Sequence, residues 1–80
     1  MKNGILKNLC YTELVYARIN KKLGFNIDNI AIENLILSLI SDDSSVIEKI
    51  AKNYYVKNYS ENISATINSY TYRVITVNRF

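Results

Sequence analysis

The chain has 80 residues, enough for one small domain but not for a catalytic domain with a separate substrate domain. Hydrophobic residues make up 49% and charged residues 21%, an ordinary globular composition that argues against intrinsic disorder. Ten lysines and arginines against seven acids give a net charge of +3, a mild bias that permits a polyanionic partner without demanding one.

Histidine is absent and cysteine occurs once, as Cys10. The chain therefore lacks the commonest metal ligand and the base of Ser-His and Cys-His catalysis. A single cysteine can build neither a zinc site nor an internal disulfide. We predict no metal and no cofactor, and we predict a cytoplasmic location because small secreted domains usually carry disulfides. No apolar run approaches the roughly 18 residues that span a bilayer, and the N-terminus lacks a signal-peptide pattern, so we expect no membrane partner.

The first quarter of the chain predicts a helix over residues 4–23. From Ile5 onward, apolar residues recur at spacings of three and four, which places them on one helical stripe. Cations occupy the last turn, and Gly24 supplies the left-handed stop. A capping residue at Thr12 leaves open a break in this helix. Cys10 lies on the apolar side, so we predict that it is a small buried hydrophobe.

A second helix is predicted to start at Asp28, a favourable N-cap. The apolar residues that follow have the spacing of one helical face: Ile32, Leu35, Ile36, Leu39 and Ile40. Ile30 and Leu37 lie off that face, so this helix is either well buried or in contact with a partner, and a homodimer could form through it. The polar run 41–45 ends the helix, and its two adjacent carboxylates, Asp42 and Asp43, are interpreted as a solvated loop or capping pair.

Residues 45–51 fit two structures. Ser45 and Glu48 have the capping-box spacing that favours a short helix. Three β-branched residues in the same segment fit a short strand. We favour the strand, chiefly because of the family resemblance described below.

The last third of the chain predicts strands. Residues 53–57 and 71–79 are rich in β-branched and aromatic residues. Residues 63–68 alternate apolar and polar side chains, as a half-buried strand does. Turn-forming residues at 58–62 and 68–69 separate these segments.

Together these segments predict one α+β domain over residues 1–80. Two N-terminal helices (1–41) pack on a three- or four-stranded antiparallel sheet (45–80). The helices cover one face of the sheet, and the other face is left for solvent, a ligand or a second copy.

Tyrosines gather in the strand region: five of the seven fall between residues 54 and 72, with lysines and arginines interleaved. A sheet face with rings between cations commonly holds single-stranded nucleic acid, since rings stack on bases and cations meet phosphates. The structural alternative is that tyrosine is simply a favoured strand residue. Alternation sends adjacent tyrosines to opposite faces, so at least two of the five are expected to pack in the core or across strands. The candidate contacts for nucleic acid or a partner are Lys52, Tyr54, Tyr55, Lys57, Tyr70, Arg73 and Arg79.

On the last strand, strict alternation places Arg73 and Arg79 on one side together with Ile75 and Val77. If that side faced the helices, the charges would need partners, because an unpaired buried charge is costly. If it faced outward, Arg73 would stand near the rim of any groove on the open face.

Three segments carry a family resemblance: residues 11–14 (YTEL), 52–56 (KNYYV) and 66–76 (TINSYTYRVIT). They resemble a family of small bacterial proteins catalogued as a domain of unknown function, and the resemblance extends over nearly the whole chain. The family usually has a glycine where this chain has Ala51, and some members have a histidine near the position of Asn78. The resemblance implies no particular activity.

The predicted order of two helices and an antiparallel sheet is also similar to the small mRNA-cleaving toxins of toxin–antitoxin systems. That likeness would imply a ribonuclease that uses Lys52, Tyr54, Arg73 and Arg79. It is a likeness of fold alone, which carries little weight on function. Asn78, in place of a histidine, counts against an active nuclease.

Three functions are therefore carried forward, and whether the protein is an enzyme stays open. The leading hypothesis is a non-catalytic module that binds nucleic acid or a nucleoprotein, in one form an inhibitor of a host defence complex. The observations behind it are the small size, the mild basicity, the clustered tyrosines and cations and the missing catalytic groups, and the expected origin is a mobile element or phage-rich genome. The alternatives are a toxin-type ribonuclease and a structural or oligomeric interaction protein.

Overall fold

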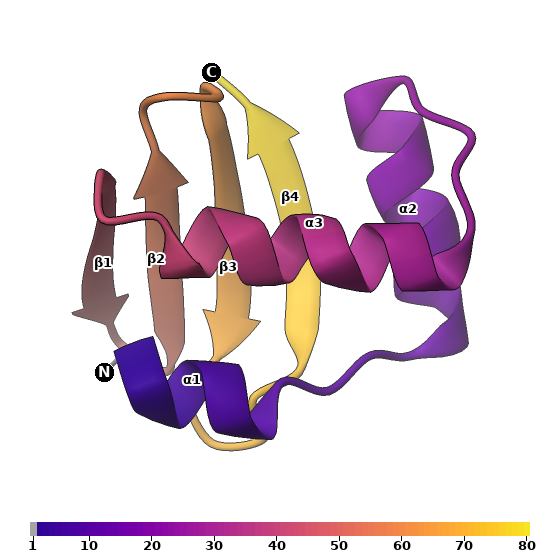
Figure 1. The fold of residues 1–80 in the computed structure, drawn as a ribbon. Coiled ribbons are helices and arrows are strands. Elements are labelled where there is room, and N and C mark those ends of the chain that lie inside the picture. Colours follow the sequence, from indigo (N-terminus) through magenta and orange to yellow (C-terminus); the bar gives the residue numbers. More distant parts are fainter. Residues whose placement is uncertain (1) are drawn as a thin grey trace.

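A computed structural model describes residues 2–80, and they form three helices followed by a four-stranded antiparallel sheet (Figure 1). The predicted α+β class is confirmed. The helices are α1 (Lys2–Asn8), α2 (Glu13–Leu23) and α3 (Asn29–Ser41). The strands are β1 (Ser45–Ile50), β2 (Asn53–Asn58), β3 (Ile63–Asn68) and β4 (Val74–Arg79), and each pairs with the next along the chain. No helix within residues 2–80 has the length and apolar character needed to cross a bilayer.

The helix predicted over residues 4–23 is two helices, separated by residues 9–12, and the predicted capping residue Thr12 directly precedes the second. Between them the chain is extended, and Cys10 forms a parallel bridge with Arg73. The Cys10 N–H donates to the Tyr72 carbonyl at 2.9 Å, and the Val74 N–H donates to the Cys10 carbonyl at 2.9 Å. The backbone around Cys10 therefore forms sheet hydrogen bonds with the outer edge of the sheet, beside the start of β4, instead of helical ones. The prediction that Cys10 is buried is wrong, since it lies in this exposed segment rather than on a helix.

The predicted C-terminal end of α2 and the predicted start of α3 are confirmed. Gly24 ends α2 in the left-handed conformation, with φ of 70° and its N–H bonded to the Asn20 carbonyl. Asp28 caps α3 by accepting a hydrogen bond from the Ala31 N–H at 2.8 Å. Asn20 also ties down the intervening loop through two hydrogen bonds with the backbone of Ile27.

Residues 45–50 are a strand, as we favoured. β1 pairs with β2 from Ser45↔Asn58 to Ile50↔Asn53, so a two-residue turn joins them. Ala51, the first residue of that turn, has φ of 54°. This left-handed conformation costs a residue with a Cβ about 1–2 kcal/mol. The turn therefore explains physically why a glycine suits this position.

A β-bulge in the last strand pair changes which residues share a face. Ile67 pairs with Val74 and Thr66 pairs with Thr76, so Ile75 is an extra residue in β4. Val74 and Val77 are consequently both buried against the helices. The prediction that Arg73 and Arg79 share one side is wrong. Arg79 shares the helical face with Val77, whereas Arg73 precedes the buried Val74 and points to the opposite face.

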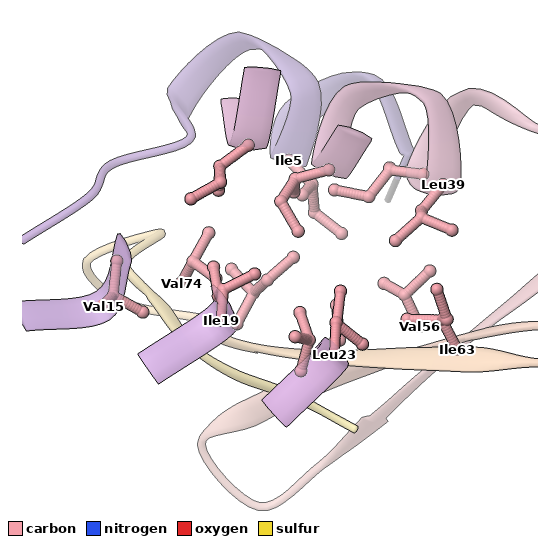
Figure 2. Close-up of a cluster of buried hydrophobic side chains, with 14 residues drawn as sticks. Ile5, Val15, Ile19, Leu23, Leu39, Val56, Ile63 and Val74 are labelled. Carbon is pink, nitrogen blue, oxygen red and sulfur yellow. The ribbon is translucent and has the colours of Figure 1, made fainter. Parts of the chain in front are cut away.

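The apolar core lies between the helices and one face of the sheet (Figures 1 and 2). α3 crosses that face, α1 lies near the end that carries the β1–β2 and β3–β4 turns, and α2 lies beside β4. Every element except β1 contributes buried side chains. They are Ile5, Val15, Ile19, Leu23, Ile32, Ile36, Leu39, Ile40, Val56, Ile63, Ala65, Ile67, Val74 and Val77.

Candidate functional site

The sheet has one face that none of the three described helices covers (Figure 1). Directly paired residues of antiparallel strands share a face, and the buried Val56, Ala65 and Val77 mark the helical one. The alternate positions form the other face, which we call the open face. Its residues are Val46, Glu48, Ile50, Asn53, Tyr55, Lys57, Ser64, Thr66, Asn68, Arg73, Thr76 and Asn78.

Two of the predicted contact residues stand on adjacent positions of this face. Tyr55 is half-buried and Lys57 is exposed. The Asn53 side-chain amide donates to the Tyr55 hydroxyl at 3.4 Å. A hollow of about 200 Å³ lies here, lined by Glu48, Ile50, Tyr55 and Lys57. A ring and a cation therefore border one shallow depression on the open face.

Three more predicted residues gather at one end of the sheet, where the two turns meet. The N–H of Ser69 and its hydroxyl both donate to the Lys52 carbonyl, at 2.8 and 2.9 Å. Lys52 is exposed in the β1–β2 turn, and Tyr70 is 76% exposed in the β3–β4 turn. Arg73 is exposed at the end of the same turn. This end thus brings an unburied ring close to two cations.

The remaining two predicted residues lie on the helical face. Tyr54 is half-buried against the core and stacks on Tyr72 with ring centroids 6.3 Å apart. Arg79 donates from Nη2 to the Leu23 carbonyl at 2.8 Å and lies 5.3 Å above the centre of the Phe25 ring. Both side chains are held in structural contacts away from the open face.

The net charge of the chain resides in its β half. Residues 45–80 hold five lysines and arginines against two acids, whereas residues 2–44 hold five of each. The one ion pair among residues 2–80 joins Lys2 to Asp43 at 3.8 Å. No acidic side chain within residues 2–80 therefore forms an ion pair with Lys52, Lys57 or Arg73, although Glu48 shares the open face.

A tyrosine pair that we did not single out lies beside α3. Tyr11 and Tyr16 stack with centroids 5.4 Å apart, and the Tyr16 hydroxyl donates to Glu33 Oε2 at 2.7 Å. Burial, followed by that hydrogen bond, raises the pKa of Tyr16 to about 12. Burial also raises the pKa of Tyr11, whose hydroxyl has no partner within residues 2–80. Both phenols therefore stay protonated near neutral pH. The clue in the sequence was their spacing of five residues, with Tyr11 before α2 and Tyr16 near its start.

The residues proposed for a ribonuclease do not form one cluster. Lys52 and Arg73 lie at the turn end of the sheet, whereas Tyr54 and Arg79 lie on the helical face, with Arg79 at the opposite end. Asn78 is exposed on the open face near that opposite end. Within residues 2–80, no three His, Cys, Asp or Glu side chains are grouped so as to hold a metal ion. The nuclease hypothesis stays a prediction without a convergent set of groups to support it.

The outer side of α3 carries the two apolar residues that lay off the predicted stripe. Ile30 is 70% exposed and Leu37 is 39% exposed. Both therefore keep exposed apolar surface within residues 2–80, and the homodimer through this helix stays a prediction.

The model of one protein family, described as "Protein of unknown function (DUF3781)", matches residues 3–78. The match covers nearly the whole chain, as the motifs at residues 11–14, 52–56 and 66–76 led us to expect. Comparisons with the curated proteins and with the solved structures return no match.

Proposed function

The chain belongs to the DUF3781 family, a domain of unknown function. From its open sheet face, we propose that it is a non-catalytic module that binds single-stranded nucleic acid, alone or within a nucleoprotein complex. The observation that carries the proposal is the position of five residues on or beside this face. They are Lys52, Tyr55, Lys57, Tyr70 and Arg73.

The rings supply the sequence-tolerant part of the binding. Tyr70 is exposed and Tyr55 borders a hollow on the open face, so each can present a ring to a base. Stacking of a base on an aromatic side chain contributes about 1–3 kcal/mol. Two such contacts would hold a short strand without reading its sequence.

The cations supply the salt-dependent part. Lys52, Lys57 and Arg73 form no ion pair with any described acid, so their charge is free to meet phosphates. Each neutralised phosphate of a single strand contributes roughly −0.7 to the slope of log affinity against log salt. Three contacts therefore predict a slope of about −2.

The test is fluorescence anisotropy with labelled single-stranded DNA and RNA, titrated at several salt concentrations. We expect binding that weakens with salt at the stated slope. A triple variant with Lys52, Lys57 and Arg73 changed to glutamine should lose most of it. The matched control changes Lys7, Lys21 and Lys22 to glutamine. These exposed lysines lie on the helices, so the control removes the same charge and should retain the affinity and slope of the wild type.

A second matched pair tests the rings. Tyr70→Ser should weaken binding several-fold, whereas Tyr59→Ser should not, because Tyr59 lies in the turn at the other end of the sheet and packs on Phe80. Absence of binding even at low salt, or equal losses in the two triple variants, would overturn the proposal. Cleavage of the RNA during the assay would overturn its non-catalytic part.

A further inference from the structure

A second hollow lies outside the open face, between the start of α2 and β4, and has a volume of about 270 Å³. α2 packs beside β4 along this edge of the sheet (Figure 1). The residues that line the hollow are Thr12, Leu14, Val15, Arg18, Arg73, Val74 and Ile75.

Two arginines line this hollow, and no acidic residue does. Arg18 donates from Nη1 to the Ile75 carbonyl at 3.1 Å, which anchors the side chain and leaves most of its five N–H donors unused. Arg73 is exposed, and neither arginine forms an ion pair with an acid among residues 2–80. Glu13 neighbours the hollow along the chain but is not part of its lining. The arrangement therefore favours an anion.

Apart from Thr12, the rest of the lining is apolar. Val15 and Val74 are buried in the core, while Leu14 is 78% exposed. Thr12 is the N-cap of α2, yet its side chain makes no capping hydrogen bond. The first N–H groups of this helix thus add a partial positive charge beside the two arginines.

We propose that this hollow binds a small ligand with an oxyanion on an apolar body. The oxyanion, a phosphate or a carboxylate, lies between Arg18 and Arg73, because the planar guanidinium matches both groups with paired hydrogen bonds. The apolar body packs against Leu14 and Val74. This site shares Arg73 with the nucleic-acid surface, but the proposal does not require that the protein bind nucleic acid.

The test uses the full chain and NMR titration of its backbone amides. Phenyl phosphate and benzoate are the two oxyanion probes, and benzyl alcohol is the uncharged control. We expect chemical-shift changes confined to residues 12–18 and 73–75 with one or both anions and none with benzyl alcohol. The anion that binds with the higher affinity identifies the ligand class.

Leu14 offers a pair of variants that introduce opposite charges. Its exposure means that Leu14→Glu and Leu14→Lys should both fold, which thermal denaturation checks. Both variants lose the apolar contact of Leu14, so both should weaken anion binding. Leu14→Glu should weaken it at least about tenfold more than Leu14→Lys, because glutamate repels the anion and lysine attracts it. Arg18→Gln should also weaken the binding of either anion while leaving the affinity for oligonucleotides unchanged. Ile30→Glu on α3 is the control for added charge elsewhere.

Three results would overturn the inference. They are no shifts at about 20 mM anion, shifts spread over the open face, or equal effects of the two Leu14 variants. Because Arg18 does not belong to the open face, failure here is distinguishable from failure of the nucleic-acid proposal. Loss of oligonucleotide binding in Arg18→Gln would show that the hollow is instead part of the nucleic-acid surface.

Discussion

Replacing Asn58 with alanine should cost about 3 kcal/mol of folding free energy, because this one side chain joins the helical half to the sheet. Asn58 is 1% exposed and is the buried polar residue of the described core. Its amide nitrogen donates to Asp42 Oδ2 at 3.0 Å and to Ser45 Oγ at 2.9 Å. Its carbonyl oxygen accepts from the Glu61 N–H at 2.9 Å.

The magnitude follows from these bonds. A hydrogen bond contributes about 1 kcal/mol, and the buried partners of a truncated side chain are left unsatisfied. Losing the three bonds of the buried Asn58 side chain therefore gives about 3 kcal/mol. For a domain of 60–100 residues this lowers Tm by about 12–24 °C.

Urea denaturation followed by circular dichroism measures this cost, and Asn58→Asp supplies the decisive comparison. Aspartate keeps the shape and the acceptor but places a second carboxylate beside Asp42. Its destabilisation should therefore be large at pH 7 and shrink as the pH falls and the carboxylates become protonated. Asn58→Ala should show no such recovery. If Asn58→Asp matched the wild type at pH 7, or if Asn58→Ala cost under about 0.5 kcal/mol, the hydrogen-bond account would be refuted.

Three further predictions probe the fold. Ala51→Gly should stabilise the protein by about 0.5–1 kcal/mol in urea denaturation, because it removes the left-handed strain of the β1–β2 turn; an unchanged midpoint would contradict this. Ile32→Val should lower the free energy of unfolding by about 1 kcal/mol, whereas the same change at the exposed Ile30 should lower it by under about 0.5 kcal/mol. Equal losses would disprove the assignment of Ile32 to the buried face of α3. The carboxyl of Asp42 has its pKa lowered from 3.8, first by a hydrogen bond from the backbone N–H of Ser44 and then by one from the side-chain amide of Asn58. Stability from its ionised form is present above the unfolded-state pKa and is lost as the pH falls through the lower folded value. Asp42→Asn should therefore flatten the stability profile below about pH 4, and an unchanged acid limb would show that the carboxylate contributes nothing.

The sequence predicted part of the candidate site for a clear reason. Tyr55 and Lys57 are two residues apart on one strand, so local alternation places them on the same face whatever the rest of the fold does. Lys52 and Tyr70 lie in turns that local composition marks, and such turns are exposed. The assignment of Tyr54 to the helical face needed the register, which depends on the partners of β2 rather than on β2 itself.

Local chemistry alone determined the ends of the helices at Gly24 and Asp28 and the half-buried pattern of β3, because each depends on residues within one turn or one strand. Tertiary contacts decided the rest. Cys10 is extended because its peptide groups bond to Tyr72 and Val74, more than sixty residues later in the chain. Arg73 and Arg79 face opposite ways because a bulge shifts the pairing of β4 with β3. A one-residue change in register reverses every side chain beyond it, and such a change is set by the partner strand, which no local pattern contains.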